Sequence, residues 1–185
     1  MKSLKSILIL TASGRNGSNS SIMAEVFAAT AESRGHEVKI VNVIDYNIKP
    51  CTGCGYCYEK GKPCIEDDDF NKLAPLIIAA DVIVFACPVY WYNFPAQTKL
   101  VIDKFISFTY GRIPLRGKKA ALLTCAEDNN KKRVFEAISL SYDKMVSFMN
   151  WSSIGKVMQE GVNEAGDIKN TRAIKDVENL VTAYL

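Results

Sequence analysis

Five short runs typical of β-strands recur along the chain, and each is followed by a longer stretch with helical periodicity. The runs cover residues 6–12, 37–43, 81–87, 118–125 and 152–158. The helical patterns cover residues 20–34, 67–80, a segment that begins at 95, and residues 131–150 and 167–184. Strands that alternate with helices predict an α/β fold, in which an open parallel sheet is covered by helices on both faces.

The composition is typical of one globular domain. Of 185 residues, 48% are hydrophobic and 23% are charged, and this length favours a single domain over residues 1–185. A loop insertion rich in cysteine and glycine lies at about residues 50–66. The net charge of +3 comes from mixed signs, so we expect no nucleic-acid partner. No apolar run approaches the ~20 residues of a membrane span, so we expect no membrane association and a cytoplasmic location.

The loop after the first predicted strand, residues 13–21, has the composition of an anion-binding site. It leads into a helix, whose first backbone N–H groups and positive dipole end attract negative charge. Its side-chain donors are Ser13, Arg15, Ser18, Asn19 and Ser20. The chain has neither a dinucleotide G-x-G-x-x-G motif nor a nucleotide P-loop, so a small phosphate ester fits better. The alternative is a polar loop with an ordinary serine cap.

A second loop, after the third predicted strand, is unusually aromatic. Residues 88–95 read Pro-Val-Tyr-Trp-Tyr-Asn-Phe-Pro. Aromatic rings at the carboxyl end of a strand can form the wall of a pocket for a flat, planar ligand. The alternative is a subunit interface or a small apolar cluster under the loop.

Four cysteines lie within fourteen residues, in the order Cys51-x2-Cys54-x2-Cys57-x6-Cys64. Thiols at this spacing, with three glycines between them, are candidates for the ligands of one [4Fe–4S] cluster. The alternatives are free thiols in a dimer-facing loop, a zinc site or a disulfide. A multi-histidine metal site is excluded, because the chain has one histidine. Cys87 and Cys125 end predicted strands, where we expect small buried residues.

These motifs together resemble a known family. Ser13-x-Arg15 followed by Asn19-Ser20, then Cys87-Pro88-Val89-Tyr90-Trp91, then Ala96-Gln97-x-Lys99, are similar to the flavodoxin-like NAD(P)H-dependent FMN reductases. The four-cysteine loop narrows the resemblance to the iron–sulfur flavoprotein branch. The resemblance extends from residue 7 to about residue 166. It implies a flavodoxin-like three-layer sandwich with strand order 2-1-3-4-5 and noncovalently bound FMN.

The resemblance also implies a role for individual residues. The FMN phosphate would contact Ser13, Arg15, Ser18, Asn19 and Ser20, and the isoalloxazine ring would contact Pro88, Val89, Tyr90, Trp91 and Asn93. The remaining wall would come from Thr124, Cys125, Ala126 and Glu127, a segment that departs from the family's frequent glycine-rich version. Cys51, Cys54, Cys57 and Cys64 would be the cluster ligands. No catalytic side chain is required, because the flavin carries the chemistry.

We therefore expect an FMN-dependent oxidoreductase that takes electrons from NADH, NADPH or a protein donor. The acceptor would be a small molecule such as a quinone, a nitro or azo compound, or a flavin. The resemblance implies a homodimer or a homotetramer, and a cluster would exchange single electrons with a ferredoxin-type partner. One alternative is a flavodoxin-like electron carrier, although such carriers are usually strongly acidic and this chain is not. Another is a thiol- or metal-sensing module without flavin.

Overall fold

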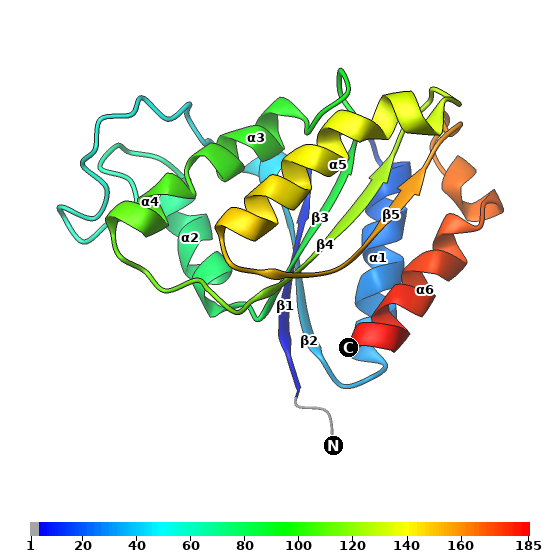
Figure 1. Cartoon of the computed structure of the whole chain (residues 1–185), viewed down its shortest axis with the longest axis horizontal. Coiled ribbons are helices and arrows are strands. Elements are labelled where there is room, and N and C mark those ends of the chain that lie inside the picture. Colours follow the sequence, from blue (N-terminus) through cyan, green and yellow to red (C-terminus); the bar gives the residue numbers. More distant parts are fainter. Residues whose placement is uncertain (1–3) are drawn as a thin grey trace.

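The five strands form one parallel sheet, in the order β2-β1-β3-β4-β5 (Figure 1). The structure is a computed structural model and describes residues 4–185. The predicted strand order and flavodoxin-like class are confirmed. The strands are β1 (Ser6–Thr11), β2 (Glu37–Asn42), β3 (Val82–Pro88), β4 (Lys119–Cys125) and β5 (Ser152–Gln159).

Helices cover both faces of this sheet (Figure 1). α1 and α6 pack on one face, and α2, α3, α4 and α5 contribute to the core on the other. No helix within residues 4–185 combines the length and the apolar character that a bilayer span needs. The helices are α1 (Asn19–Glu32), α2 (Phe70–Ala79), α3 (Ala96–Asp103), α4 (Ile106–Tyr110), α5 (Lys131–Phe148) and α6 (Ala173–Tyr184).

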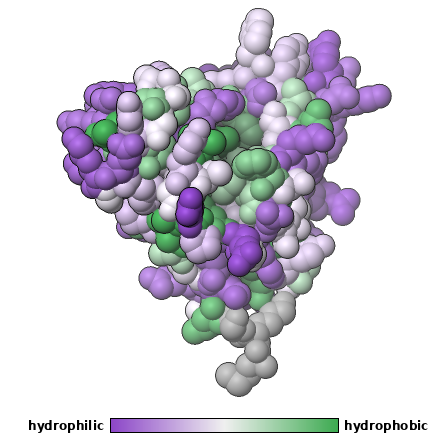
Figure 2. Space-filling model, turned by 60° about the vertical axis from the view of Figure 1, so that its left-hand side comes forward, coloured by the Kyte–Doolittle hydropathy of each residue, from purple (hydrophilic) through white to green (hydrophobic). Residues whose placement is uncertain are grey.

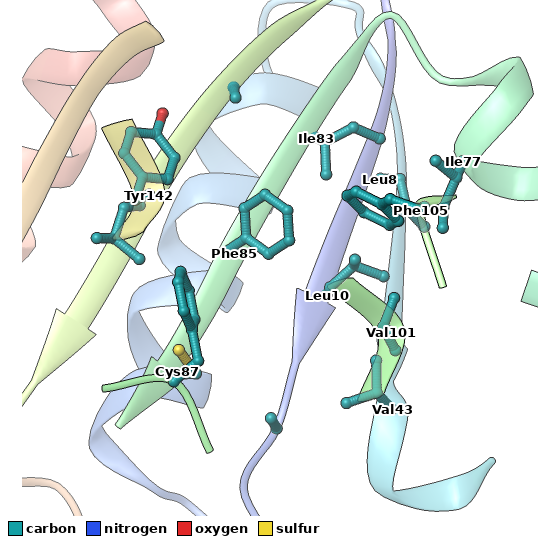
Figure 3. Packing of buried hydrophobic residues seen from close by; sticks show 14 of the residues in the cluster. Leu8, Leu10, Val43, Ile77, Ile83, Phe85, Cys87, Val101, Phe105 and Tyr142 are labelled. Atoms are coloured by element: carbon teal, nitrogen blue, oxygen red, sulfur yellow. The ribbon is translucent and has the colours of Figure 1, made fainter. Parts of the chain in front are cut away.

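The three central strands, β1, β3 and β4, are apolar because side chains on both of their faces are buried, whereas the edge strands β2 and β5 carry exposed polar residues. Successive residues of a strand point to opposite sides of the sheet. Ile7 and Ile9 of β1 therefore belong to the core under α1 and α6, whereas Leu8 and Leu10 belong to the core on the other side. Figure 3 shows Leu8 and Leu10 packed with Phe85 of β3 in this second core.

The start of α2 differs from the prediction. The sequence suggests Asp67 as the cap of a helix over residues 67–80, but α2 begins at Phe70. The residue at the N-cap position is Asp69, so the cap assigned to Asp67 is wrong. Asp68 Oδ1 accepts a hydrogen bond from the Phe70 N–H at 2.8 Å. Asp68 is buried, and its Oδ2 lies 3.1 Å from Nζ of the buried Lys104. A contact between residues so far apart in the chain cannot be predicted from the local sequence pattern. Pro75 lies inside α2, where it has no backbone N–H to donate to the preceding turn.

Two further segments differ from the predicted helices. The short helix α4 follows α3 directly and was not predicted. The last predicted helix, residues 167–184, is divided into a 3-10 turn at Asp167–Asn170 and α6, which begins at Ala173.

Phe85 anchors the core beneath α5, and its loss should be costly. Its ring is fully buried and meets the rings of Phe94 and Tyr142 edge-on, at centroid distances of 6.0 and 6.5 Å. We expect Phe85→Ala to lower the free energy of unfolding by about 3–5 kcal/mol, because it leaves a cavity between three elements. Chemical denaturation would measure this. The exposed Leu140 of α5 offers the control, since Leu140→Ala should change stability by less than about 0.5 kcal/mol.

Candidate functional site

A pocket of about 260 Å³ opens at the carboxyl edge of the sheet, between the loops that follow β1, β3 and β4. Thr11 of β1 pairs with Ala86 of β3, so the loops that leave these two strands begin side by side. Open α/β sheets bind their ligands at this position, where the strand order reverses. The predicted residues that line the pocket are Ser13, Arg15, Ser18, Asn19, Ser20, Pro88, Val89, Tyr90, Cys125, Ala126 and Glu127.

One end of the pocket is rich in free hydrogen-bond donors. Ser18 caps α1, where its Oγ accepts from the Ser21 N–H at 3.2 Å. The backbone N–H groups of Ser18 and Asn19 find no acceptor within residues 4–185, and the buried Ser20 Oγ has no partner there. A helix start with unused donors is the most favourable place in a fold for a phosphate group.

The Asn19 side chain, predicted to contact a phosphate, is hydrogen-bonded to the segment that follows β5. Its Nδ2 donates to the Glu164 carbonyl at 3.0 Å, and its Oδ1 accepts from the N–H groups of Gly166 and Ile168, both at 3.1 Å. These three bonds use most of what an amide side chain can form. The Asn19 side chain therefore holds the β5–α6 segment against α1, and its backbone N–H faces the pocket as a donor.

Arg15 lies at the entrance of the same end. Its Nη1 donates to the Asn163 carbonyl at 3.3 Å, and the side chain is exposed. A guanidinium has five N–H donors in a planar fork, so this single bond leaves others for an anion. Arg15 thus combines a contact to the β5–α6 segment with a free positive charge at the pocket.

The aromatic loop forms a tight hairpin beside the pocket. Tyr90 and Asn93 exchange two backbone hydrogen bonds, at 3.0 and 3.1 Å. Trp91 and Tyr92 at its tip have φ values of +49° and +68°, a left-handed conformation that costs of order 1–3 kcal/mol for such residues. Tyr90 lines the pocket, whereas the Trp91 side chain is 94% exposed and projects from the tip.

The structure places three predicted residues outside the pocket. Trp91 points to solvent, and Asn93 is turned toward α5, where its Nδ2 donates to Ser141 Oγ at 3.3 Å. Thr124 is fully buried inside β4, behind the pocket wall, and its Oγ1 has no partner within residues 4–185. Register explains Thr124, because the side chains of Thr124 and Cys125 must point to opposite faces of the sheet.

The two strand-end cysteines are small buried residues, as predicted. Cys87 is fully buried, and Cys125 is 5% exposed. Burial raises the pKa of the Cys125 thiol to about 12, although a hydrogen bond from the Ser20 backbone works in the opposite direction. The pKa of Cys87 is raised further, mainly by burial. Both thiols stay protonated at neutral pH, so they act as apolar packing groups.

One wall of the first pocket comes from the segment after β5, whose residues were not predicted to line a site. Val162, Asn163 and Ala165 line the pocket, and the Val162 N–H donates to the Ala126 carbonyl at 3.0 Å. Gly161 and Gly166 flank this wall, both with positive φ. The two glycines around an asparagine after the last strand were the available signal, but polar loops of this composition are common and name no ligand.

A second pocket of about 500 Å³ lies under the cysteine-rich loop, and all four thiols of that loop line it. Cys51 and Cys54 are exposed, while Cys57 and Cys64 are half-buried. Burial raises the pKa of Cys57, and the neighbouring Cys54, Cys51 and Cys64 add to this effect. All six cysteines are free thiols. Figure 2 shows this side of the molecule turned forward, with apolar residues scattered among hydrophilic ones.

Lys104, which lines this second pocket, forms a buried ion pair with Asp68. Lys104 Nζ lies 3.1 Å from Asp68 Oδ2 and 3.4 Å from Cys64 Sγ, and both charged side chains are almost fully buried. Burial alone would lower the pKa of Lys104, but the contacts with Asp68 and Cys64 outweigh burial and leave it raised. Lys104 is therefore an ammonium group at neutral pH.

Comparison with known proteins assigns the family. A family model described as NADPH-dependent FMN reductase matches residues 6–156. The chain belongs to this FMN reductase family. The resemblance noted in the sequence is thereby confirmed.

Two proteins that are similar in sequence to this chain are named iron–sulfur flavoproteins. An iron–sulfur flavoprotein of Archaeoglobus fulgidus is 38% identical over 116 residues, which are 62% of this chain and 51% of that protein. An iron–sulfur flavoprotein of Methanosarcina thermophila is 31% identical over 121 residues, or 65% of this chain and 63% of that protein. This FMN reductase family member thus spans between half and two thirds of the length of these relatives.

Solved structures show the same fold. The NAD(P)H:quinone oxidoreductase of Methanothermobacter marburgensis superposes with a TM-score of 0.77, over 97% of this chain and 95% of that one, at 19% identity. The likeness supports the fold of this FMN reductase family member.

The residues of the first pocket fit FMN. The unused N–H groups of Ser18 and Asn19, the unpartnered Ser20 Oγ and the Arg15 guanidinium are suited to a phosphate. The enclosed volume is slightly below the ~300–1,000 Å³ of pockets that bury a whole drug-sized ligand. A phosphate and its sugar-like chain can occupy the enclosed part, so a planar ring has to extend along the Tyr90 hairpin.

The second pocket has the donor atoms that a cluster needs, but these atoms do not converge on one point. Four thiols on one pocket are the donor set that iron–sulfur clusters use. Gly53, Gly55 and Gly61 have positive φ, so the loop can turn sharply between the cysteines. Within residues 4–185, however, no three Cys, His, Asp or Glu side chains converge at metal-binding geometry.

The Asn19 side chain should hold the β5–α6 segment in place and protect its amides from exchange. We expect Asn19→Ala to lower the free energy of unfolding by about 1–3 kcal/mol, because the amides of Gly166 and Ile168 lose their acceptor. Hydrogen exchange measured by mass spectrometry should show faster exchange at these two amides. The exposed Asn16 in the same loop is the control, and Asn16→Ala should leave both amides unchanged. Unchanged exchange in Asn19→Ala would show that the segment is held by other contacts.

Proposed function

We propose that this protein is an FMN-dependent oxidoreductase that takes electrons from NADPH or NADH and reduces a small molecule. One observation carries the proposal: a helix start with unused donors and an aromatic hairpin share a single pocket at the point where the strand order reverses. The family assignment supports FMN and a reduced nicotinamide.

When bound, FMN accepts a hydride equivalent and passes electrons on singly or in pairs. The chain's own residues bind and orient it. The α1 start and Arg15 hold the phosphate by charge-assisted hydrogen bonds. The backbone of the Pro88–Val89 segment is fixed, since the Val89 N–H donates to the Cys125 carbonyl at 2.9 Å. A fixed edge of this kind can orient the polar side of a flat ring, and no side-chain acid or base is needed.

The acceptor class follows from the shape of the site. The pocket opens beside an exposed aromatic hairpin, which favours flat, apolar electron acceptors such as quinones, nitro or azo compounds, or free flavin. The fold is shared with a protein named as a quinone oxidoreductase, which supports this choice of class.

We further propose that the protein works as a homodimer or a homotetramer. The Trp91 side chain is almost wholly exposed beside the pocket, and Tyr90 and Tyr92 are also exposed. Large aromatic side chains in this position are typical of protein interfaces, where they are removed from water. A second copy that covers the hairpin would also complete the wall over the flavin ring.

We also propose that Cys51, Cys54, Cys57 and Cys64 hold an iron–sulfur cluster. Their common pocket and the names of the relatives support this proposal. A cluster at this position supplies single-electron transfer, which fits a ferredoxin-type protein partner. We propose a cytoplasmic location with it, because a reducing compartment would keep these cysteines available as ligands.

The decisive experiment is to purify the protein without oxygen and count flavin, iron and sulfide per chain. Steady-state oxidation of NADPH and NADH with a quinone acceptor is then measured on the same sample. Flavin with turnover supports the oxidoreductase. Flavin without turnover would make the protein an electron carrier, and the absence of flavin after incubation with FMN would overturn the proposal. Iron and sulfide in equal amounts support the cluster, whereas flavin without iron would leave a simple FMN reductase.

Arg15 should contribute to FMN affinity. Removing a charged donor to a phosphate costs about 1.5–3 kcal/mol, so Arg15→Ala should weaken FMN binding by roughly 10- to 150-fold. Quenching of flavin fluorescence on titration would measure the dissociation constant. Arg34, exposed just beyond the other end of α1, provides the matched control. Wild-type affinity in Arg15→Ala would place the phosphate elsewhere.

A further inference from the structure

The buried Lys104 does more than neutralise Asp68. Asp68 already accepts two backbone hydrogen bonds, from the N–H groups of Lys49 and Phe70, both at 2.8 Å. These bonds fix the two ends of the cysteine-rich loop. A buried ammonium group is costly unless its donors are used, so each of its contacts has energetic weight. The Lys104 ammonium contacts one further polar atom in the structure, the Cys64 sulfur at 3.4 Å.

Cys64 is also the best-anchored of the four thiols. Its backbone N–H donates to Asn71 Oδ1 at 2.7 Å, which ties it to the first turn of α2. Cys51 and Cys54 lie on the exposed, glycine-containing part of the loop. The four candidate ligands are therefore unequal, because only the Cys64 backbone among them is hydrogen-bonded to the first turn of α2 within residues 4–185, and its sulfur lies beside the Lys104 ammonium group.

We propose that Lys104 is a positioning residue for the cluster: it fixes the Cys64 sulfur as a ligand and donates a charge-assisted hydrogen bond to it. This inference rests on the proposed cluster site. Hydrogen bonds to ligand sulfurs and nearby positive charge favour the reduced, more negative state of a cluster. Lys104 thus sets the reduction potential of the cluster above the value that the four thiolates alone would give.

The test is a redox titration of the cluster in the whole protein, after loading with iron and sulfide. Lys104→Met keeps the length of the apolar stem and removes the donor. Lys104→Arg retains a cation that can reach both Asp68 and the sulfur. Lys72→Met is the matched control, since Lys72 pairs with Asp69 beside the same loop but is 75% exposed, where solvent screens its charge. Iron content and the thermal unfolding of the cluster-free protein are measured for each variant.

We expect Lys104→Met to lower the midpoint potential by about 59 mV, a tenfold change in the ratio of reduced to oxidised cluster for one electron. Lys104→Arg should recover at least half of this shift, and Lys72→Met should match the wild type. If Lys104→Met folds normally but takes up no iron while Lys104→Arg does, the positioning role is also supported.

Three results would overturn the inference. The first is a fully loaded Lys104→Met variant with the wild-type potential. The second is a failure of both Lys104 variants to fold or to load, which would reduce Lys104 to a packing residue. The third is a wild-type protein that binds no iron, which refutes the cluster itself. Iron counts separate this third result from the first two.

Discussion

The parallel pairing of β1 with both β2 and β3 is the constraint on which the rest of the structure depends. Because β1 lies between them, the chain moves to one side of β1 to form β2 and then crosses back over β1 to form β3. The loops after β1 and β3 then separate above the sheet edge and leave room for a ligand. Helices pack over both faces of this central strand, which is why its apolar run is continuous. One register thus determines the core and the position of the pocket together.

Much of this could be read from the sequence, because strands with two buried faces leave a strong signal. The runs that became β1, β3 and β4 were found within one or two residues, and their loops supplied most of the pocket lining. The features that the sequence did not indicate share a physical cause. The Asp68–Lys104 ion pair, the hydrogen bonds of the Asn19 side chain and the turn of Asn93 toward α5 all depend on partners far along the chain. Local periodicity contains no information about such contacts.

The two pockets are linked by one short helix. α3 begins directly after the aromatic hairpin and ends one residue before Lys104, and a helix of its eight residues is about 12 Å long. The end of the hairpin and the ion pair beneath the cysteine-rich loop are therefore attached to the same rigid element. A change in the packing of α3 would be felt at both sites, which gives the flavin pocket and the thiol loop a physical route for coupling.

The bonds made by Asn19 have a consequence for the order in which the protein is built. They join residues 145, 147 and 149 positions apart, among the longest separations in the chain. Contacts of this range close late, since the entropy of a long loop must be lost before they form. The phosphate end of the pocket is thus completed after the central sheet, when the last strand and helix arrive. We therefore expect a growing chain on the ribosome to complete this end of the pocket only when almost all of it has emerged.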